Sequence, residues 1–513
     1  MDLQDGVMPP GIRRTLLTVC TMSATIMQAL DMTIANVALP YMQGSLSASL
    51  DQVNWILTSY IVAAAIMTAP VGWITDRFGR KKLFVVCVSG FTVASLLCGL
   101  AQNIEQMVLF RLMQGAFGAA LVPLSQSVML DIYPIQQRGS AMAIWATGIM
   151  LGPIMGPTLG GWLTENYSWH WVFLVNLPVG IVTVLGLLAF MDETKRQHHL
   201  RFDWFGFIAL AIGIGSLQLM LDRGEQLGWF DSPEIVAELI ISIAGFYFFF
   251  AHSLTTPEPF VRFALFKDKN YVGACIIMAA IGVILFGTLA VATPYLQKVV
   301  GFPVLTAGWL LATRGLGTLL GTPLVGRLMM FVEARYLVFG GLALTTFALH
   351  EMIGFTDQTP ASTIVIINLV QGVGLSLVFI PLNTVSFMTL PAHLRTDGTA
   401  MLTLIRNISS SIGISVVIAN LTNKTTAFHS QLAEHITPFN DALQMPDVAS
   451  VFDLATPQGR ALIDQLVTQQ ATVIAYINDF KLLMFVAIVT LPFVLLMGSS
   501  RGIRKPAQHA AID

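Results

Sequence analysis

Residues 60–100 read YIVAAAIMTAPVGWITDRFGRKKLFVVCVSGFTVASLLCGL, and this stretch decides the fold. Two apolar runs, each long enough for a helix that crosses a membrane, flank a short turn that holds Arg77, Arg80, Lys81 and Lys82. Loops on the cytoplasmic side of a membrane carry an excess of Lys and Arg. The stretch therefore predicts two membrane helices joined by a cytoplasmic turn.

The composition of the whole chain agrees with this reading. The 513 residues are 55% hydrophobic and only 11% charged, whereas soluble domains carry roughly 25% charged residues. Such a chain cannot cover its surface in water, which excludes a large soluble protein. The net charge of -2 gives no basic field for nucleic acid. The four cysteines lie in apolar stretches without the spacing of a disulfide framework or a metal site: Cys20, Cys87, Cys98 and Cys275.

The chain contains fourteen stretches that are apolar and long enough to span a membrane. The predicted spans are 15–40, 53–75, 83–101, 106–130, 140–162, 170–190, 204–222, 234–254, 270–297, 303–326, 336–355, 362–388, 397–422 and 480–498. With both termini in the cytoplasm, most of the 27 Lys and Arg residues fall in cytoplasmic loops and tails, as the positive-inside rule requires. A wrong number of spans would scramble this alternation.

The sequence also repeats itself weakly. Arg111-Leu-Met-Gln114-Gly115 matches Asn368-Leu-Val-Gln371-Gly372, and similar matches join 139–142 with 398–401 and 71–72 with 325–326. Each match is eight predicted spans apart, so both copies point the same way, which is typical of transporters that rock two bundles around a central site. We expect an all-α membrane protein with a six-helix bundle over 1–200, two inserted helices over 201–258, a second six-helix bundle over 259–500 with a long periplasmic loop at 423–479, and a cytoplasmic tail at 501–513.

Two charged residues fall inside the first bundle. Asp31 lies about nine residues before Pro40, or about 13 Å along a helix, and is therefore well inside the apolar slab. Arg111 lies at a matching depth in the fourth span, which predicts that the two side chains pair. A carboxylate at this depth costs about 2.5–3.5 kcal/mol to insert. It either loads and unloads a proton or, as the simpler alternative, pairs with the arginine to hold helices together.

Two glycine-containing motifs predict how the bundles move. The turn between the second and third spans, with the inner end of the fourth, predicts a cluster that closes the cytoplasmic side: Gly72, Asp76, Arg77, Gly79, Arg80, Lys81 and Asp131. In this cluster Arg80 is expected near Asp131, and Asp76 near helix N-termini. The fifth span carries a stripe of glycines four residues apart with two prolines: Gly148, Gly152, Pro153, Gly156, Pro157, Gly160 and Gly161. Small residues at this spacing allow close helix packing, and the prolines favour a bend. The span therefore suits either an ordinary tight helix crossing or a helix that closes the contact between the bundles and bends as they move.

These motifs resemble those of a known family over essentially the whole chain. The turn at 72–82 resembles the signature loop of the major facilitator superfamily, and the Gly-Pro stripe is similar to its antiporter motif. Residues 30–40, LDMTIANVALP, with 169–180, WHWVFLVNLPVG, resemble the fourteen-helix drug:proton antiporters of the EmrB/QacA type. Ala35 and His170 depart from the residues that are commoner at their places. The resemblance implies an inner-membrane multidrug efflux antiporter, with Asp31 and Arg111 as the coupling pair and Asp76, Arg80 and Asp131 as the gating cluster.

The predicted substrate cavity is lined by polar residues of the inner helix faces: Gln28, Asn36, Gln114, Arg314, Gln371, Asn383 and Arg406. Few acids lie deep in the spans, with Glu238 the nearest exception after Asp31, which favours neutral or weakly acidic lipophiles over dications. No phosphate-binding loop or catalytic constellation occurs, so we expect no enzyme, metal site or cofactor and a proton gradient as the energy source. By the resemblance, we expect the loop at 423–479 to dock a periplasmic adaptor, with an outer-membrane channel as a further partner, and a passive extension is the alternative. A proton-coupled nutrient symporter and a non-transporting membrane sensor remain open as alternatives.

Overall fold

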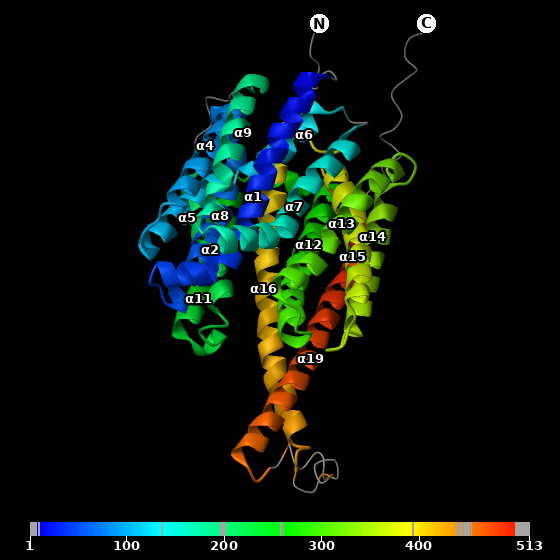
Figure 1. Cartoon of the computed structure of the whole chain (residues 1–513). Helices are drawn as coiled ribbons and strands as arrows, with labels where there is room; N and C mark the ends of the chain where they lie inside the picture. The colour runs from blue at the N-terminus through cyan, green and yellow to red at the C-terminus, as the bar shows by residue number, and fades with distance from the viewer. Residues whose placement is uncertain are drawn as a thin grey trace, which may run out of the picture.

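The computed structural model describes residues 11–134, 137–194, 202–256, 261–391, 394–437 and 454–497, with the single residues at 8, 259, 440, 445 and 452. All regular structure in these residues is helical (Figure 1). The expected linker between the first bundle and the inserted helices and the expected tail at 501–513 lie wholly or largely outside the described residues.

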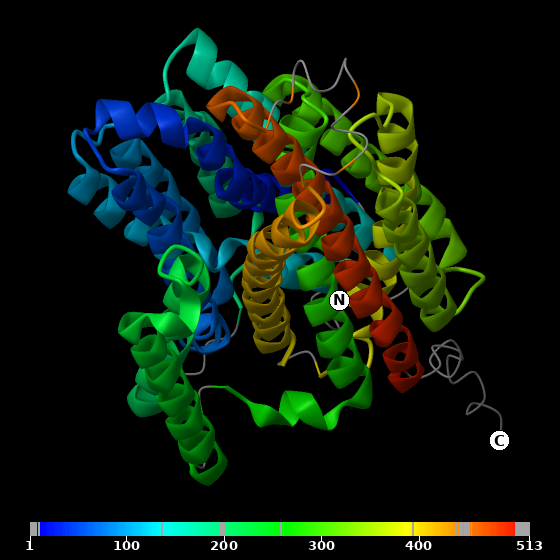
Figure 2. The ribbon, with the colours of Figure 1, turned by 90° about the horizontal axis from the view of Figure 1, so that it is seen from below.

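The described residues of the first half form nine helices, and some of these helices are two parts of a single membrane crossing. They are α1 (Ile12–Ser45), α2 (Leu50–Thr68), α3 (Val71–Phe78), α4 (Arg80–Cys98), α5 (Ile104–Gly118), α6 (Leu121–Ile132), α7 (Arg138–Asn166), α8 (Trp171–Leu174) and α9 (Asn176–Phe190). Two helices follow, α10 (Trp204–Arg223) and α11 (Pro233–Thr255), joined through the short turn η2 (Trp229–Asp231). They stand beside α2 and α16 at one side of the molecule (Figure 2).

The second half begins with the short turn η3 (Phe263–Lys267). Its helices are α12 (Lys269–Pro294), which continues as the π-helical turn η4 (Tyr295–Val299), α13 (Val304–Leu328), α14 (Ala334–Ile353), α15 (Ala361–Val385), α16 (Arg395–Ala433) and α19 (Pro457–Thr490), which ends in η6 (Leu491–Leu496).

The two halves use the same set of helix pairs. In the first half, α1 packs on α7 and α9, α2 on α5, and α4 on α5 and α9. In the second half, α12 packs on α16 and α19, α13 on α15, and α14 on α15 and α19. Glycines of the repeated motif make equivalent approaches, since a Cβ on Gly115 would strike the Tyr60 carbonyl and one on Gly372 would strike the Arg314 carbonyl. The weak sequence repeat thus corresponds to a repeat in packing.

Several of the predicted continuous spans are divided between two helices, and 170–190 is one of them, with Val175 between α8 and α9. The stretch expected at 53–75 is divided into α2 and α3, whose axes differ by 57°, and Pro70 stands at the break. Proline lacks the N–H of a helical hydrogen bond and its ring clashes with the preceding turn, which explains the bend. The stretch expected at 106–130 is divided into α5 and α6 at Ala119 and Ala120. This break follows Gly118 and precedes Pro123.

The long loop expected at 423–479 is largely helical. α16 runs on to Ala433 and α19 begins at Pro457, so only 434–456 connects them. The two helices pack on each other and extend past the other helices as a hairpin (Figure 1). Ile463, Val467 and Ala471 are buried at helical spacing, whereas the residues between them are mostly exposed. The hydropathy of the sequence predicts only where the chain leaves the apolar layer of the membrane. Beyond that point α16 and α19 continue as amphipathic helices, because each covers the apolar face of the other.

Eleven of the described helices are long and apolar enough to cross a membrane, or up to twelve when α2 and α3 are counted as one broken span. The chain is therefore a multi-pass membrane protein. Neither α7 nor α13 is among these eleven helices, although both are long and both lie within the bundle.

The apolar core shows how the halves meet. One large cluster joins buried residues of both halves, from Leu17 and Leu130 to Val385 and Leu402. It lies at the end of the molecule where α1 begins and where Arg80, Arg262 and Arg395 gather, which we call the basic end. Towards the opposite end, the hairpin end, each half keeps its own cluster, around Ile34 and Phe173 in the first half and around Tyr295 and Phe480 in the second. The two halves are thus packed together at the basic end and have separate cores at the hairpin end.

Candidate functional site

The sequence-predicted pair of Asp31 and Arg111 is present in the interior of the first half. Asp31 of α1 accepts a hydrogen bond from Arg111 Nη1 of α5 over 2.7 Å. Arg111 also donates from Nε to the Ile56 carbonyl of α2 at 3.1 Å. The carboxylate is 0% and the guanidinium 1% exposed. The pair therefore joins three helices of one bundle without contact with solvent.

Amide side chains complete the shell of the pair. Gln114, one turn after Arg111, donates from Nε2 to Asp31 Oδ1 at 2.8 Å and accepts from Arg111 Nη1 at 2.8 Å. Asn176, at the start of α9, donates to Asp31 Oδ1 at 3.4 Å and to Ser95 Oγ at 3.1 Å. The guanidinium lies 4.2 Å from the centre of the Tyr60 ring, a cation–π contact. Residues from α1, α2, α4, α5 and α9 thus hold one carboxylate.

This arrangement balances opposing contributions to the free energy of the charged carboxylate. Burial of a carboxylate away from water is strongly unfavourable, and the arginine and two amide donors offset that cost. Removing one partner of such a buried pair costs about 3–5 kcal/mol, because the other charge is left uncompensated. A change that admits water or shifts the guanidinium would therefore alter whether Asp31 holds a proton.

The equivalent place in the second half holds an unpaired cation. Asn368 of α15 donates to the Leu310 carbonyl of α13, as Arg111 does to Ile56. Arg314, at the place of Tyr60, donates to Asn368 Oδ1 at 3.4 Å. Within the described residues no carboxylate pairs with Arg314, and both polar atoms of the fully buried Gln371 side chain have no hydrogen-bond partner. The second half thus presents a buried positive charge where the first has a compensated pair.

The remaining residues of the predicted cavity are spread over different surroundings. Gln28 is buried in α1 next to Met32, and Arg406 of α16 is 9% exposed with a long contact to Asn407. Asn36 is exposed. Asn383 is placed elsewhere, in the seam between the halves, where it accepts a hydrogen bond from Gln126 Nε2 at 2.7 Å.

The gating residues meet charged partners from the other half at the basic end. Asp131 at the end of α6 accepts from Arg80 at 2.5 Å, as the sequence predicted, and also from Arg395 of α16 at 2.8 Å. Thr396, next to Arg395, contacts both Ser127 and Arg80. One carboxylate of the first half therefore bridges a cation from each half.

A second interhalf ion pair involves the turn after α3. Asp76 accepts from Arg262 at 2.6 Å, and the other nitrogen of Arg262 lies 3.5 Å from Asp397 at the start of α16. Gly72 allows this approach, since a Cβ there would strike the Asp397 side chain. Asp76, which the sequence predicts near helix N-termini, thus shares an arginine of the second half with Asp397 at the N-terminal end of α16.

The rest of the turn is fixed within the first half. Gly79 has a φ of 95°, a left-handed conformation that favours glycine, and Glu193 occupies the space that a side chain would need. The Lys81 backbone N–H donates to Glu193 at 3.1 Å, and its ammonium group donates to the Leu188 carbonyl at 2.8 Å. Arg77 Nη1 is buried without a hydrogen-bond partner.

The glycine stripe of α7 faces α1 within the first half. A Cβ on Gly152 would strike the Ala29 backbone, and one on Gly156 would strike Thr33, whose hydroxyl donates to the Gly152 carbonyl at 3.0 Å. Gly148 and Gly160 make similar approaches to α1, and Gly161 lies near Val37. Contact with the second half is made by other α7 residues that face α13, so the stripe itself provides the tight crossing. The side chains of Pro153 and Pro157 lie outside those described, and the expected bend stays a prediction.

The sequence motifs do not identify several charged residues of the site. Arg262, Arg395 and Asp397 complete the basic end, and the match of 398–401 with 139–142 pointed to this region without identifying the acid and cations. Asp479 in α19 is 0% exposed and accepts from Asn420 at 2.7 Å. It precedes the last predicted span, and its burial became visible only with the hairpin.

Comparisons with known proteins agree with this architecture. The family model described as Major Facilitator Superfamily matches residues 21–414. The multidrug export protein EmrB of Haemophilus influenzae is 34% identical over 462 residues, 90% of this chain and 91% of that protein. EmrB of Escherichia coli is 33% identical over 91% of both chains. The fatty acid resistance protein FarB of Neisseria gonorrhoeae is 32% identical over 95% of this chain and 97% of that protein.

Solved structures share the fold at low sequence identity. The human organic anion transporter MFSD10 has a TM-score of 0.57 at 15% identity, and the match covers 93% of this chain and 100% of the MFSD10 chain. A bacterial homolog of the human lysosomal transporter Spinster, in an inward-facing and unoccupied conformation, has a TM-score of 0.55 at 18% identity over 95% and 98% of the two chains. The resemblance predicted from the motifs is confirmed, and the chain belongs to the major facilitator superfamily, close to its EmrB multidrug export proteins.

Proposed function

We propose that the chain is a multidrug efflux antiporter that exports small lipophilic compounds across the inner membrane in exchange for protons, by alternating access. The observation that carries the proposal is the enclosed Asp31–Arg111–Gln114 network in one half, opposite a half without a carboxylate at the equivalent place. The names of the relatives, multidrug export protein above all, support the class of function. No cofactor is required, since the proton gradient supplies the free energy.

The closure of the basic end and the separate cores at the hairpin end support the alternating-access part of the proposal. If the basic end is cytoplasmic, the structure corresponds to a state closed to the cytoplasm. Asp31 is enclosed in this state, so exchange of its proton requires water to reach it, and the ion pairs of Asp76 and Asp131 would have to break before the cytoplasmic side opens. Protonation of Asp31 is the event that weakens its hold on Arg111 and links the two processes.

We propose neutral or weakly acidic lipophiles as substrates. The buried guanidinium groups of Arg314 and Arg406 face no carboxylate within the described residues and would favour an anionic or polar group on a bound compound. FarB bears the name of a fatty acid resistance protein, and fatty acids belong to this class.

The topology in the membrane is part of the proposal. Counting α2 with α3 as one crossing and adding α7 and α13 to the spans found by length and composition gives fourteen, with α10 and α11 inserted between the halves. Arg13, Arg80, Arg138 and Arg395 gather at the basic end, which supports a cytoplasmic location for that end and for both termini. The four native cysteines are buried, so single cysteines added at the two ends would report the orientation.

The hairpin of α16 and α19 is proposed to dock a periplasmic adaptor that connects to an outer-membrane channel. It extends beyond the other helices and carries exposed apolar residues on its outer part, such as Leu462 and Leu466. Deleting 424–475 with a short linker should leave proton-coupled transport in liposomes intact and abolish drug resistance in cells. Equal loss in both assays would mean that the hairpin belongs to the transport core.

The coupling is tested by Asp31→Asn in proteoliposomes. We expect substrate binding to survive and to lose its dependence on pH, because the amide keeps the shape of a protonated carboxyl group. Export driven by an imposed pH gradient should stop. Asp192→Asn is the matched control, since Asp192 is an exposed acid paired with Arg13 at the surface, and it should transport normally.

The same assay separates the alternatives. A nutrient symporter would accumulate substrate on the side to which protons flow, and a sensor would show no counterflow at all. Full proton-coupled export by the Asp31→Asn variant would refute the assignment of Asp31.

A further inference from the structure

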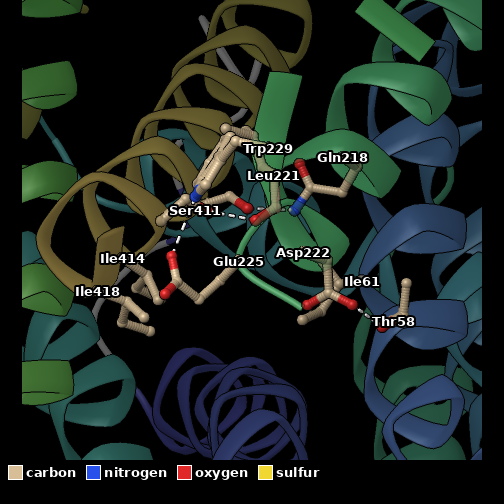
Figure 3. Close-up of a pocket in the computed structure, with 11 residues that line it drawn as sticks. Thr58, Ile61, Gln218, Leu221, Asp222, Glu225, Trp229, Ser411, Ile414 and Ile418 are labelled. Carbon is tan, nitrogen blue, oxygen red and sulfur yellow. Dashed lines mark hydrogen bonds between the residues drawn. The ribbon is translucent and has the colours of Figure 1, made fainter. Parts of the chain in front are cut away.

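A pocket lies at the junction of the three parts of the chain. It is formed by α2 of the first half, the inserted helix α10 with the turn after it, and α16 of the second half (Figure 3). Its volume is about 130 Å³. The polar groups around it come from Thr58, Gln218, Asp222, Glu225 and Ser411, and Trp229 and isoleucines of α2 and α16 form its apolar walls.

The hydrogen-bond donors of this pocket are nearly all used by the protein itself. Thr58 donates to Asp222, Gln218 Nε2 donates to Ser411 Oγ at 2.8 Å, and Trp229 Nε1 donates to Glu225 Oε2 at 3.0 Å (Figure 3). Among the described side chains that line the pocket, Ser411 keeps a rotatable hydroxyl hydrogen that can be donated.

Acceptors, by contrast, are left over. Gln218 is 3% exposed, and its Oε1 is a buried acceptor without a hydrogen-bond partner. Asp222 and Glu225 each accept one of these hydrogen bonds through a single oxygen, and within the described residues no hydrogen bond reaches the other oxygen of either carboxylate. A buried acceptor such as Gln218 Oε1 is nearly always satisfied, by protein, water or a ligand, and the exposed Asp222 and half-buried Glu225 add acceptors at the mouth of the pocket. The pocket therefore suits a ligand that carries several N–H donors.

The charge of the pocket points to the same ligand. Arg223 follows Asp222 directly, but its guanidinium is engaged by Glu234 and lies 5.4 Å from the Trp55 ring, which is not part of the lining. Asp222 and Glu225 thus give the pocket a net negative charge, and the indole of Trp229 offers a face to a cation or a flat apolar group.

We propose that this pocket binds a small organic amine in its protonated form. The ammonium group donates to Asp222 and to Gln218 Oε1, and the hydrocarbon part lies against Trp229, Ile414 and Ile418. The site is distinct from the central one, where Arg314 and Arg406 bring positive charge. A primary ammonium group occurs both in free arylalkylamines and in the head group of phosphatidylethanolamine, and the pocket recognises that shared chemistry.

Occupancy of the pocket has a conformational consequence. Thr58 belongs to the first half and Ser411 to the second, and both line the same space through α10. A ligand held between them stabilises the spacing of α2 and α16 seen in this structure, in which the basic end is closed. Amine binding therefore favours the state with the basic end closed.

The probe is radiolabelled phenethylamine, bound to the purified full-length chain in nanodiscs of phosphatidylcholine and phosphatidylglycerol. We expect saturable binding that weakens by about tenfold in Asp222→Asn, the loss expected when a charge-assisted hydrogen bond becomes a neutral one. Gln218→Glu, which places a second charge at the ammonium, should strengthen binding. Asp231→Asn, an exposed acid of the same turn outside the pocket lining, is the matched control and should bind like the parent chain.

Two further arms make the proposal refutable. Phenethyl alcohol, the neutral analogue, should not compete. The assay measures equilibrium binding and not transport, so failure of the coupling assignment does not affect this test. Competition when phosphatidylethanolamine is added to the nanodiscs would identify the lipid as the source of the ammonium group. Unchanged affinity in both Asp222→Asn and Gln218→Glu, or equal competition by the alcohol, would overturn the proposal.

Discussion

Arg111 in α5 and Asn368 in α15 occupy equivalent places in the two halves, and each donates a hydrogen bond to a backbone carbonyl of the helix beside it. The charges around them differ. Arg111 has the carboxylate of Asp31 and the amide of Gln114, whereas Asn368 has the guanidinium of Arg314, and the amide of Gln371 is left without partners.

This difference in charge indicates that the two halves of the fold have different tasks. A compensated pair stores a proton-dependent charge without requiring a ligand, because its cost of burial is already offset. Burying an uncompensated cation and an unsatisfied amide costs free energy, and a substrate that pairs with these groups would reduce that cost. We interpret the first half as the proton-handling half and the second as the one that contributes more to substrate binding.

The largest expected effect separates the two arginines. Arg111→Met should lower the free energy of unfolding by about 3–5 kcal/mol, since Asp31 is left buried without its partner. Arg314→Met removes a cation that has no acid partner, and its stability should be unchanged or higher. Thermal unfolding in detergent measures both, and equal destabilisation would remove the distinction between the halves.

Substitutions of two equivalent glycines test whether the two halves share the same close helix packing. Gly115→Ala and Gly372→Ala each push a Cβ into a backbone carbonyl of the adjacent helix, and each should cost about 1–3 kcal/mol through overpacking. Gly340→Ala in α14, where no atom lies within 4 Å, is the matched control and should not destabilise. A large difference between the first two would mean that the packing repeat is only approximate at these positions.

The interhalf ion pairs should shift the conformational equilibrium moderately. Asp76→Asn weakens the contact with Arg262 and should raise labelling of a cysteine at Gln126, in the seam, by about threefold to tenfold from the cytoplasmic side, as expected for the loss of one charge-assisted hydrogen bond. Arg262→Gln should have the same effect, and the double variant should add little. Normal labelling in both single variants would mean that the turn sets only the membrane topology and does not control closure of the basic end.

The smallest effect on stability is expected when the second half receives an acid. Asn368→Asp would place a carboxylate beside Arg314, and the cost of burying the new carboxylate offsets most of what its attraction to the guanidinium contributes to stability. The affinity for weakly acidic substrates should nevertheless fall, because the new carboxylate neutralises the cation, while neutral substrates bind as before. Binding of a fatty acid and of a neutral dye, measured side by side, would check this.

The sequence alone determined the membrane character, the repeat of the two halves and the depth of Asp31 and Arg111. These features depend on local properties: the length of apolar runs, the distribution of cations and the position of a charge along a helix. The pairing of Arg80 with Asp131 was also predictable, because both lie in the same motif region at the same membrane face.

Tertiary structure decided what depends on partners distant in sequence. Arg262, Arg395 and Asp397 close the basic end from the second half, and no local pattern distinguishes them from other loop charges. The glycine stripe packs on α1 because close approach depends on which helix stands opposite. The sequence predicts a loop where α16 and α19 form a hairpin, because each helix covers apolar residues of the other. Such mutual burial is a property of the pair that neither segment carries by itself.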